Sequence, residues 1–163
     1  MIKQNINRKL GMDLKKFRNV LSKFATGVTV VSTIDKKNNP IGMTVNSFSS
    51  VSLDPPLVLW SIGLKQPSYD IFIKAKGYSV NILSKDQKDV CDLFSSPVDD
   101  KFKMVNYAIS DNGFPIIKNS LAWFDCIKWK YYPGGDHQIL VAEVKGFFSN
   151  ENDPLIFWNS SIT

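Results

Sequence analysis

Cysteine and histidine are scarce in this sequence. Its 163 residues include two cysteines, Cys91 and Cys126, and a single histidine, His137. No C-x-x-C pair occurs, so a thioredoxin-type motif is excluded. One histidine with two distant cysteines gives no support to a zinc site. We therefore expect no bound metal, two ordinary buried cysteines and a reducing compartment.

Long apolar runs and nucleotide-binding glycine motifs are also missing. No stretch reaches the length of a membrane span, and the N-terminus lacks a signal-peptide pattern. This predicts a cytoplasmic protein without a membrane partner. Neither G-x-G-x-x-G nor G-x-x-x-x-G-K-S/T is present, so the sequence contains no recognisable Rossmann or P-loop site. No serine nucleophile elbow precedes His137, and hydrolase chemistry therefore has no support.

The charge excess is local rather than general. The formal net charge is +5, and residues 1–25 contain seven basic side chains and one acidic side chain, which leaves the rest close to neutral. A basic helix could contact nucleic acid or anionic lipid. No RNA-binding or zinc-finger signature accompanies it, and a solvated helix face is the simpler interpretation. We expect no nucleic-acid partner.

Length and composition predict one globular domain. Hydrophobic residues make up 44% of the chain, which is typical of a folded protein. We expect residues 1–163 to form a single domain in which the polar residues 1–12 are flexible. The chain contains 11 Phe, 5 Tyr and 4 Trp. Aromatic residues build β-rich cores and also line pockets for flat cofactors.

The hydrophobic patterns predict more strands than helices. Asp13 can cap a helix whose apolar residues recur every three to four positions, and Gly27 can end it. Apolar runs bounded by proline and glycine predict strands, several of them in hairpins. Alternating βαβ order is absent, so we expect a mainly β fold, an antiparallel barrel with short flanking helices. The predicted helices cover 14–26, 68–75 and 84–94, and the predicted strands 28–34, 41–48, 57–62, 78–83, 121–132, 138–149 and 155–158.

The first candidate site is a polar stretch from Thr44 to Ser52. Strand alternation would place Thr44, Asn46 and Phe48 on one face of the sheet and Val45 and Ser47 on the other. Hydroxyl and amide groups beside the free backbone groups of a strand end suit a polar heterocycle that carries a phosphate. A serine-rich turn has the same composition, so both interpretations stay open. The candidate binding residues are Thr44, Val45, Asn46, Ser47, Ser49 and Ser50.

Two shorter segments could complete such a site. Lys65 lies between Ser61 and Ser68, just before a predicted helix. Its charge and the free N–H groups of a helix N-terminus attract phosphate, although Ser68 could serve only as an N-cap. His137 lies in a tight glycine-rich turn, 134–137. It could be a solvent-exposed turn residue, or its imidazole could hydrogen-bond a substrate amide, stack on a ring or pair with a phosphate.

Several motifs follow one another along residues 13–158. They are FATGVTVV at 24–31, GMTVNSFSSVSLDPPLV at 42–58, VNIL at 80–83, DKF at 100–102, LAW at 121–123, GDH at 135–137 and EV at 143–144. Together they resemble the flavin reductase-like family of FMN-binding split barrels. This family contains the reductase components of two-component flavin-dependent monooxygenases.

The resemblance implies a fold, an assembly and a role for each candidate segment. The fold would be a split β-barrel that forms a homodimer, with flavin near the subunit interface. The segment from Thr44 to Asn46 would lie along the isoalloxazine edge, and Ser49 and Ser50 would lie near the ribityl chain or the phosphate. His137 would lie beside the nicotinamide and the flavin. The phosphate cradle would be completed by Ser61, Lys65 and Ser68.

The implied activity is hydride transfer from NADH or NADPH to FMN or FAD, which supplies reduced flavin to a separate monooxygenase. The protein would hold two flat rings with their reacting atoms about 3–3.5 Å apart, and His137 would position the nicotinamide. Lys65 stands where relatives usually have an arginine or a polar pair. The alternatives are a non-catalytic FMN-binding or electron-transfer protein on the same fold, an oxidase of a phosphorylated vitamin B6 compound, and a nucleic-acid-binding barrel.

Overall fold

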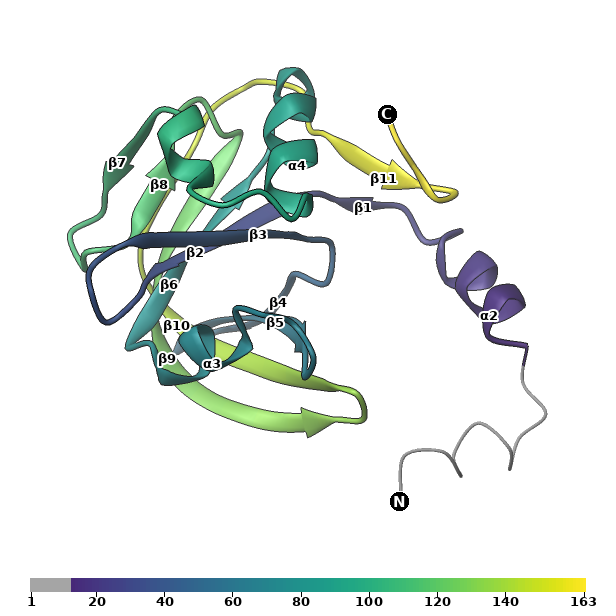
Figure 1. The fold of residues 1–163 in the computed structure, drawn as a ribbon, viewed down its shortest axis with the longest axis horizontal. Helices are drawn as coiled ribbons and strands as arrows, with labels where there is room; N and C mark the ends of the chain where they lie inside the picture. The colour runs from purple at the N-terminus through teal and green to yellow at the C-terminus, as the bar shows by residue number, and fades with distance from the viewer. Residues whose placement is uncertain (1–12) are drawn as a thin grey trace.

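The computed structural model describes residues 13–163, so the expected flexibility of residues 1–12 lies outside the described residues. Helix α2 (Leu14–Leu21) lies apart from the sheets (Figure 1). The Asp13 carboxylate caps it as predicted, accepting hydrogen bonds from the backbone N–H of Lys15 at 2.9 Å and of Lys16 at 3.1 Å. The prediction that Gly27 ends this helix is wrong. Gly27 belongs to strand β1 (Thr26–Gly27), because its backbone pairs with a strand near the C-terminus.

Seven antiparallel strands form the main sheet, in the order β3-β2-β6-β9-β10-β5-β4. This confirms the predicted mainly β, antiparallel fold. The edge strands β3 and β4 are consecutive in sequence, and only residues 46–48 join them. Such a link spans roughly 14 Å at most, so the sheet must roll until its two edges come close. No strand pairing joins β3 to β4 within residues 13–163. The strands are β2 (Thr29–Ile34), β3 (Pro40–Val45), β4 (Ser49–Leu53), β5 (Pro56–Gly63), β6 (Gly77–Ile82), β9 (Ala122–Gly134) and β10 (His137–Ser149).

The rolled sheet buries an apolar cluster on each of its faces. The inner cluster includes Trp60 of β5 and Phe72 of helix α3 (Tyr69–Lys74), whose rings meet edge to face at 5.0 Å. The outer cluster lies between the sheet and helix α4 (Lys88–Ser95), where Val30 packs with Cys91 and Phe94. Successive strand residues therefore contribute to opposite clusters, as the two-residue period of a strand requires.

Smaller elements complete the fold. A hairpin of β7 (Tyr107–Ile109) and β8 (Pro115–Ile117) follows the 3-10 helix η2 (Lys101–Met104), and the 3-10 helix η1 (Lys85–Gln87) precedes α4. Strands β11 (Ile156–Trp158) and β12 (Ser161–Ile162) form a second sheet with β1. Asn81 of β6 is fully buried. Its side chain donates to the Val30 carbonyl at 3.0 Å and accepts from the Ile117 N–H at 2.9 Å, which makes it a structural residue that ties β6 to β2 and β8.

Candidate functional site

A hollow of about 490 Å³ lies along the free edge of β3. Its walls come from three segments that are distant in sequence: residues 40–44 of β3, residues 66–68 before α3, and residues 94–102 between α4 and η2. Thr44 and Ser68, two of the predicted site residues, both line it. Because no strand of the described residues pairs with β3 on this side, alternate N–H and C=O groups of its backbone remain available to a ligand. The volume lies in the range of cofactor sites.

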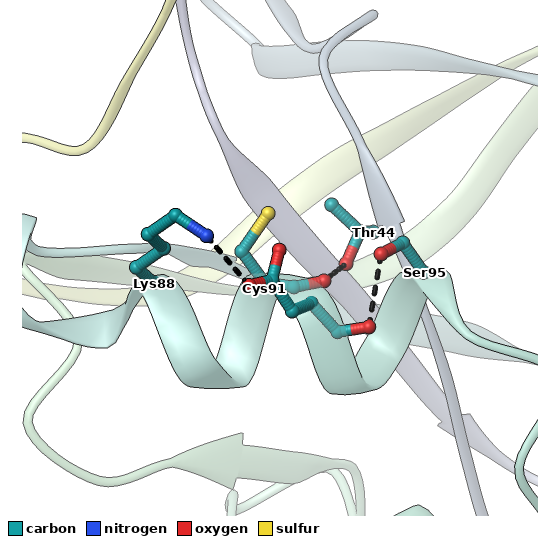
Figure 2. A network of polar contacts seen from close by, with 5 residues as sticks. Thr44, Lys88, Cys91 and Ser95 are labelled. Atoms are coloured by element: carbon teal, nitrogen blue, oxygen red, sulfur yellow. Dashed lines mark hydrogen bonds and ion pairs between the residues drawn. The ribbon is translucent and has the colours of Figure 1, made fainter. Parts of the chain in front are cut away.

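Helix α4 holds Thr44 in place. The Thr44 hydroxyl donates to the Cys91 carbonyl at 2.9 Å, and Figure 2 shows this contact beside Lys88 and Ser95 of the same helix. The Lys88 ammonium pairs with the Asp92 carboxylate at 2.7 Å on the exposed side of α4. Since the hydroxyl proton of Thr44 points to the helix, Thr44 can offer a ligand only its oxygen lone pairs and its backbone groups.

Ser47 holds the two edges of the sheet together. Its hydroxyl donates to the Ser61 carbonyl at 3.2 Å and accepts from the Ser61 N–H at 3.0 Å. This clasp joins the link between β3 and β4 to the C-terminal part of β5. The structure therefore brings two predicted site residues together, but the Ser47 side chain is used by the fold, which leaves mainly its backbone for a ligand.

Strand β3 ends at Val45, so the predicted alternation does not reach Phe48. Phe48 stacks on Phe124 with ring centroids 5.6 Å apart and packs against the inner cluster, as Val45 does. The prediction that Phe48 shares a face with Thr44 is therefore wrong, because the chain turns after Val45. Asn46, Ser49 and Ser50 are exposed beside this turn, and the Ser49 hydroxyl donates to the Ser50 carbonyl at 3.2 Å.

The loop before α3 places Lys65 in solvent and Ser68 against β3. Ser68 occupies the N-cap position, but its side chain makes no capping hydrogen bond; its hydroxyl lies 3.6 Å from the Met43 sulfur. Helix α3 has only six residues. Any attraction for phosphate here would therefore depend on the Lys65 charge and the hydroxyl groups more than on the helix N-terminus.

Lys101 lines the same hollow and was absent from the predicted set. Its ammonium donates to the Phe94 carbonyl at the end of α4, at 3.1 Å. Partial burial lowers the pKa of Lys101, and the nearby Asp99 opposes this shift. The motif DKF at 100–102 contains this lysine, so the sequence did carry a signal for it, although spacing alone could not connect it with Thr44.

His137 lies beside the loop that carries Lys65. It begins β10 directly opposite Gly63, and the Leu64 N–H donates to the Asp136 carbonyl at 3.0 Å. The imidazole is about half exposed, and its Nδ1 lies 2.7 Å from the Asp136 carboxylate. The hydrogen bond with His137 lowers the pKa of Asp136, and the charges of His137 and Arg18 add to this effect. The chain thus joins its only histidine to a loop that precedes it by about 70 residues.

Other features of the described chain give weaker evidence for a functional site. A hollow of about 580 Å³ between the β7–β8 hairpin and β9–β10 contains none of the predicted site residues. Among residues 13–163, no group of three His, Cys, Asp or Glu side chains converges as metal ligands. No described helix is both long and apolar enough to cross a membrane. Cys91 and Cys126 are free and buried, and burial raises the pKa of both thiols.

Comparison with known sequences identifies a close match over most of the chain. The family described as "Flavin reductase like domain" matches residues 21–163. FMN reductase (NADH) SmoA of Agrobacterium fabrum is 43% identical over 147 residues, which cover 90% of this chain and 83% of that protein. The reductase component of the flavin-dependent trigonelline monooxygenase of Acinetobacter baylyi is 42% identical over 136 residues, which cover 83% of this chain. This chain spans only 44% of that relative's length.

Solved structures with the same fold extend the likeness. The NADH:FAD oxidoreductase SgcE6 of Streptomyces globisporus, in complex with NAD and FAD fragments, superposes with a TM-score of 0.88 at 31% identity. The alignment covers 93% of this chain and 92% of that one. The flavin reductase PheA2 in its native state superposes with a TM-score of 0.85 at 40% identity, covering 93% of this chain and 97% of that one.

Proposed function

Because this chain belongs to the flavin reductase-like family, we propose that it reduces FMN or FAD with NADH or NADPH and supplies reduced flavin to a separate monooxygenase. The hollow at the free edge of β3 is the observation that carries this proposal. It gathers polar groups from three distant segments beside unpaired backbone groups, which is what a flat heterocycle with a polar tail needs.

Residues that line the hollow and residues beside it together fit a flavin. The edge of β3 near Thr44 and Asn46 would pair with the polar edge of the ring system. Exposed Ser49 and Ser50 would meet the ribityl chain, and the phosphate would lie toward Ser68. Lys65 and Lys101 would supply positive charge as point charges rather than as a fork. When bound, the flavin supplies the acceptor for the hydride of the nicotinamide.

The protein's own contribution is orientation. The turn that carries His137 is joined to the loop after β5 by the backbone contact between Asp136 and Leu64. His137 would therefore position the nicotinamide from one side while β3 and its link hold the flavin from the other. Backbone N–H groups near Asn46 would stabilise negative charge on the reduced ring system. No acid–base residue is required for a hydride transfer of this kind.

We also propose that the rolled sheet is a split barrel and that two copies form a homodimer. Helix α2 supports this, because its apolar residues Leu14, Phe17 and Leu21 are all exposed in the single chain. Leu53, at the end of the edge strand β4, is 95% exposed. A second copy covering these residues would lie close to the flavin-binding link. A cytoplasmic location is part of the proposal, since free cysteines suit a reducing compartment.

A spectroscopic experiment tests the proposed function. The purified protein is titrated with FMN, FAD and riboflavin, and NADH or NADPH is then added without oxygen. The expected results are saturable flavin binding followed by loss of the flavin's visible absorbance. His137→Ala should raise the KM for NADH and leave flavin affinity unchanged. Binding without reduction by either nicotinamide would identify a flavin carrier instead. Absence of flavin binding would refute both functions.

A further inference from the structure

The proposed reaction assigns a role to His137 but none to its neighbour Asp136. The role inferred here for Asp136 rests on that reaction. A neutral imidazole has one nitrogen that donates a hydrogen bond and one that accepts. The Nδ1 atom of His137 lies 2.7 Å from Oδ1 of Asp136. An ionised carboxylate can only accept, so Nδ1 must hold the proton in this contact. The lone pair of the neutral ring is then on Nε2.

The ionised state of Asp136 follows from its surroundings. The hydrogen bond from His137 is the main cause that keeps the pKa of this carboxyl below its usual range, the positive charge of a protonated His137 adds to it, and the charge of Arg18 on α2 contributes least. The Asp136 side chain is 94% exposed, so water also solvates the charge. At neutral pH the partner of Nδ1 is therefore a carboxylate and never a donor.

The backbone determines where the Nε2 lone pair lies. His137 pairs with Gly63, the Leu64 N–H donates to the Asp136 carbonyl at 3.0 Å, and the Gln66 N–H donates to the Gly63 carbonyl at 3.0 Å. A methyl group placed on Gly63 would lie 3.7 Å from Nε2. The acceptor thus faces the loop between β5 and α3. No donor of residues 13–163 forms a hydrogen bond with it, so it is available to a ligand.

We propose that Asp136 is a positioning residue that holds His137 as the Nδ1–H tautomer and presents Nε2 as an acceptor to the carboxamide NH2 of the nicotinamide. In the neutral ring, this geometry suits the recognition of an amide donor. A phosphate partner would need a protonated Nε2, and a stacking role would not need Asp136 at all.

The tautomer can be measured directly, because His137 is the only histidine in the chain. A long-range proton–nitrogen correlation spectrum of untagged, nitrogen-15-labelled protein at mildly alkaline pH reports which ring nitrogen is protonated. The expected result is Nδ1–H in the wild type and the Nε2–H form, which free histidine prefers, in Asp136→Ala. The matched control is Asp111→Ala, which removes an exposed aspartate from the β7–β8 turn. An Nε2–H wild type, or an unchanged tautomer in Asp136→Ala, would overturn the proposal.

A substrate analogue tests what the acceptor recognises. Reduced 3-acetylpyridine adenine dinucleotide has a methyl group in place of the carboxamide NH2. The wild type should show a KM for NADH about fivefold lower than for this analogue, the effect of one net hydrogen bond. Asp136→Ala should lose this preference and keep its affinity for FMN, whereas Asp136→Glu should restore part of it. An equal preference in wild type and Asp136→Ala contradicts the inference. Failure of the wild type to oxidise either dinucleotide refutes the proposed function instead, and the spectrum separates the two cases.

Discussion

Ser47 and Ser49 offer a sharp contrast between a residue that the fold uses and one that a ligand can reach. The Ser47 hydroxyl makes two hydrogen bonds to the backbone of Ser61, at 3.0 and 3.2 Å, and both atoms of Ser61 are partly buried. Ser49 makes one local contact at 3.2 Å and is exposed. The same substitution to alanine should therefore have different effects at the two positions.

The loss in the free energy of unfolding expected for Ser47→Ala follows from the two hydrogen bonds between Ser47 and Ser61. Each net hydrogen bond contributes roughly 0.5–1.5 kcal/mol, so losing both lowers the free energy of unfolding by about 1–3 kcal/mol. For a chain of this size that corresponds to a melting temperature lower by roughly 2–12 °C. Ser49→Ala should change stability by less than about 0.5 kcal/mol, as exposed substitutions usually do, while it weakens flavin binding.

Urea unfolding checks the first effect, with the fluorescence of the fully buried Trp60 as one of its signals. Flavin titration of the folded variants checks the second. If Ser47→Ala is as stable as Ser49→Ala, the clasp does not hold the sheet edges together. If Ser49→Ala binds FMN and riboflavin like the wild type, the assignment of Ser49 to the flavin tail is wrong.

Three further predictions follow from other residues. Asn81→Leu should destabilise the protein by about 1–3 kcal/mol in urea unfolding, since it leaves the buried Ile117 N–H without its partner; a loss below about 0.5 kcal/mol would show that water replaces the amide. Burial raises the pKa of Cys91 and Cys126, so above about pH 9 the unfolded chain loses thiol protons that the folded chain keeps, and the free energy of unfolding should fall as pH rises. Replacing both cysteines with alanine should reduce that slope, and an unchanged slope would assign it to other groups. Lys65→Gln should weaken FMN binding about threefold to tenfold and leave riboflavin binding unchanged; if Lys101→Gln does so instead, Lys101 is the phosphate's cation.

The strand arrangement shows how much of the fold can be predicted from sequence patterns. Apolar runs located every strand of the main sheet except β4, because local periodicity reflects burial of one face. The helix predicted at 84–94 is in fact the 3-10 helix η1 followed by α4, which begins only at Lys88. The end of the first helix was wrong. Gly27 has the residue type of a helix stop, yet a strand more than a hundred residues later pairs with it. Pairing between distant segments overrides a local signal of that kind.

The polar stretch from Thr44 to Ser50 shows, within the candidate site, which features residue type predicts and which features only the tertiary structure decides. Its composition indicated a ligand-binding segment, but the hydroxyl groups within it could not be told apart. The fold turns the Thr44 hydroxyl to α4 and the Ser47 hydroxyl to β5, and it leaves Ser49 exposed. Residue type shows which hydrogen bonds a side chain can make, while the tertiary structure decides which partner takes them.

By itself, the sequence determined the mainly β, antiparallel class and the family, because these depend on local periodicity and on motifs in order; the segments of the site stay a prediction. Only the tertiary structure decided that the edge of β3 borders a hollow, that Lys101 shares it with Thr44, and that His137 lies beside Gly63. These depend on a sheet that rolls to bring its first and last strands together. Distances between residues far apart in the chain have no counterpart in local sequence.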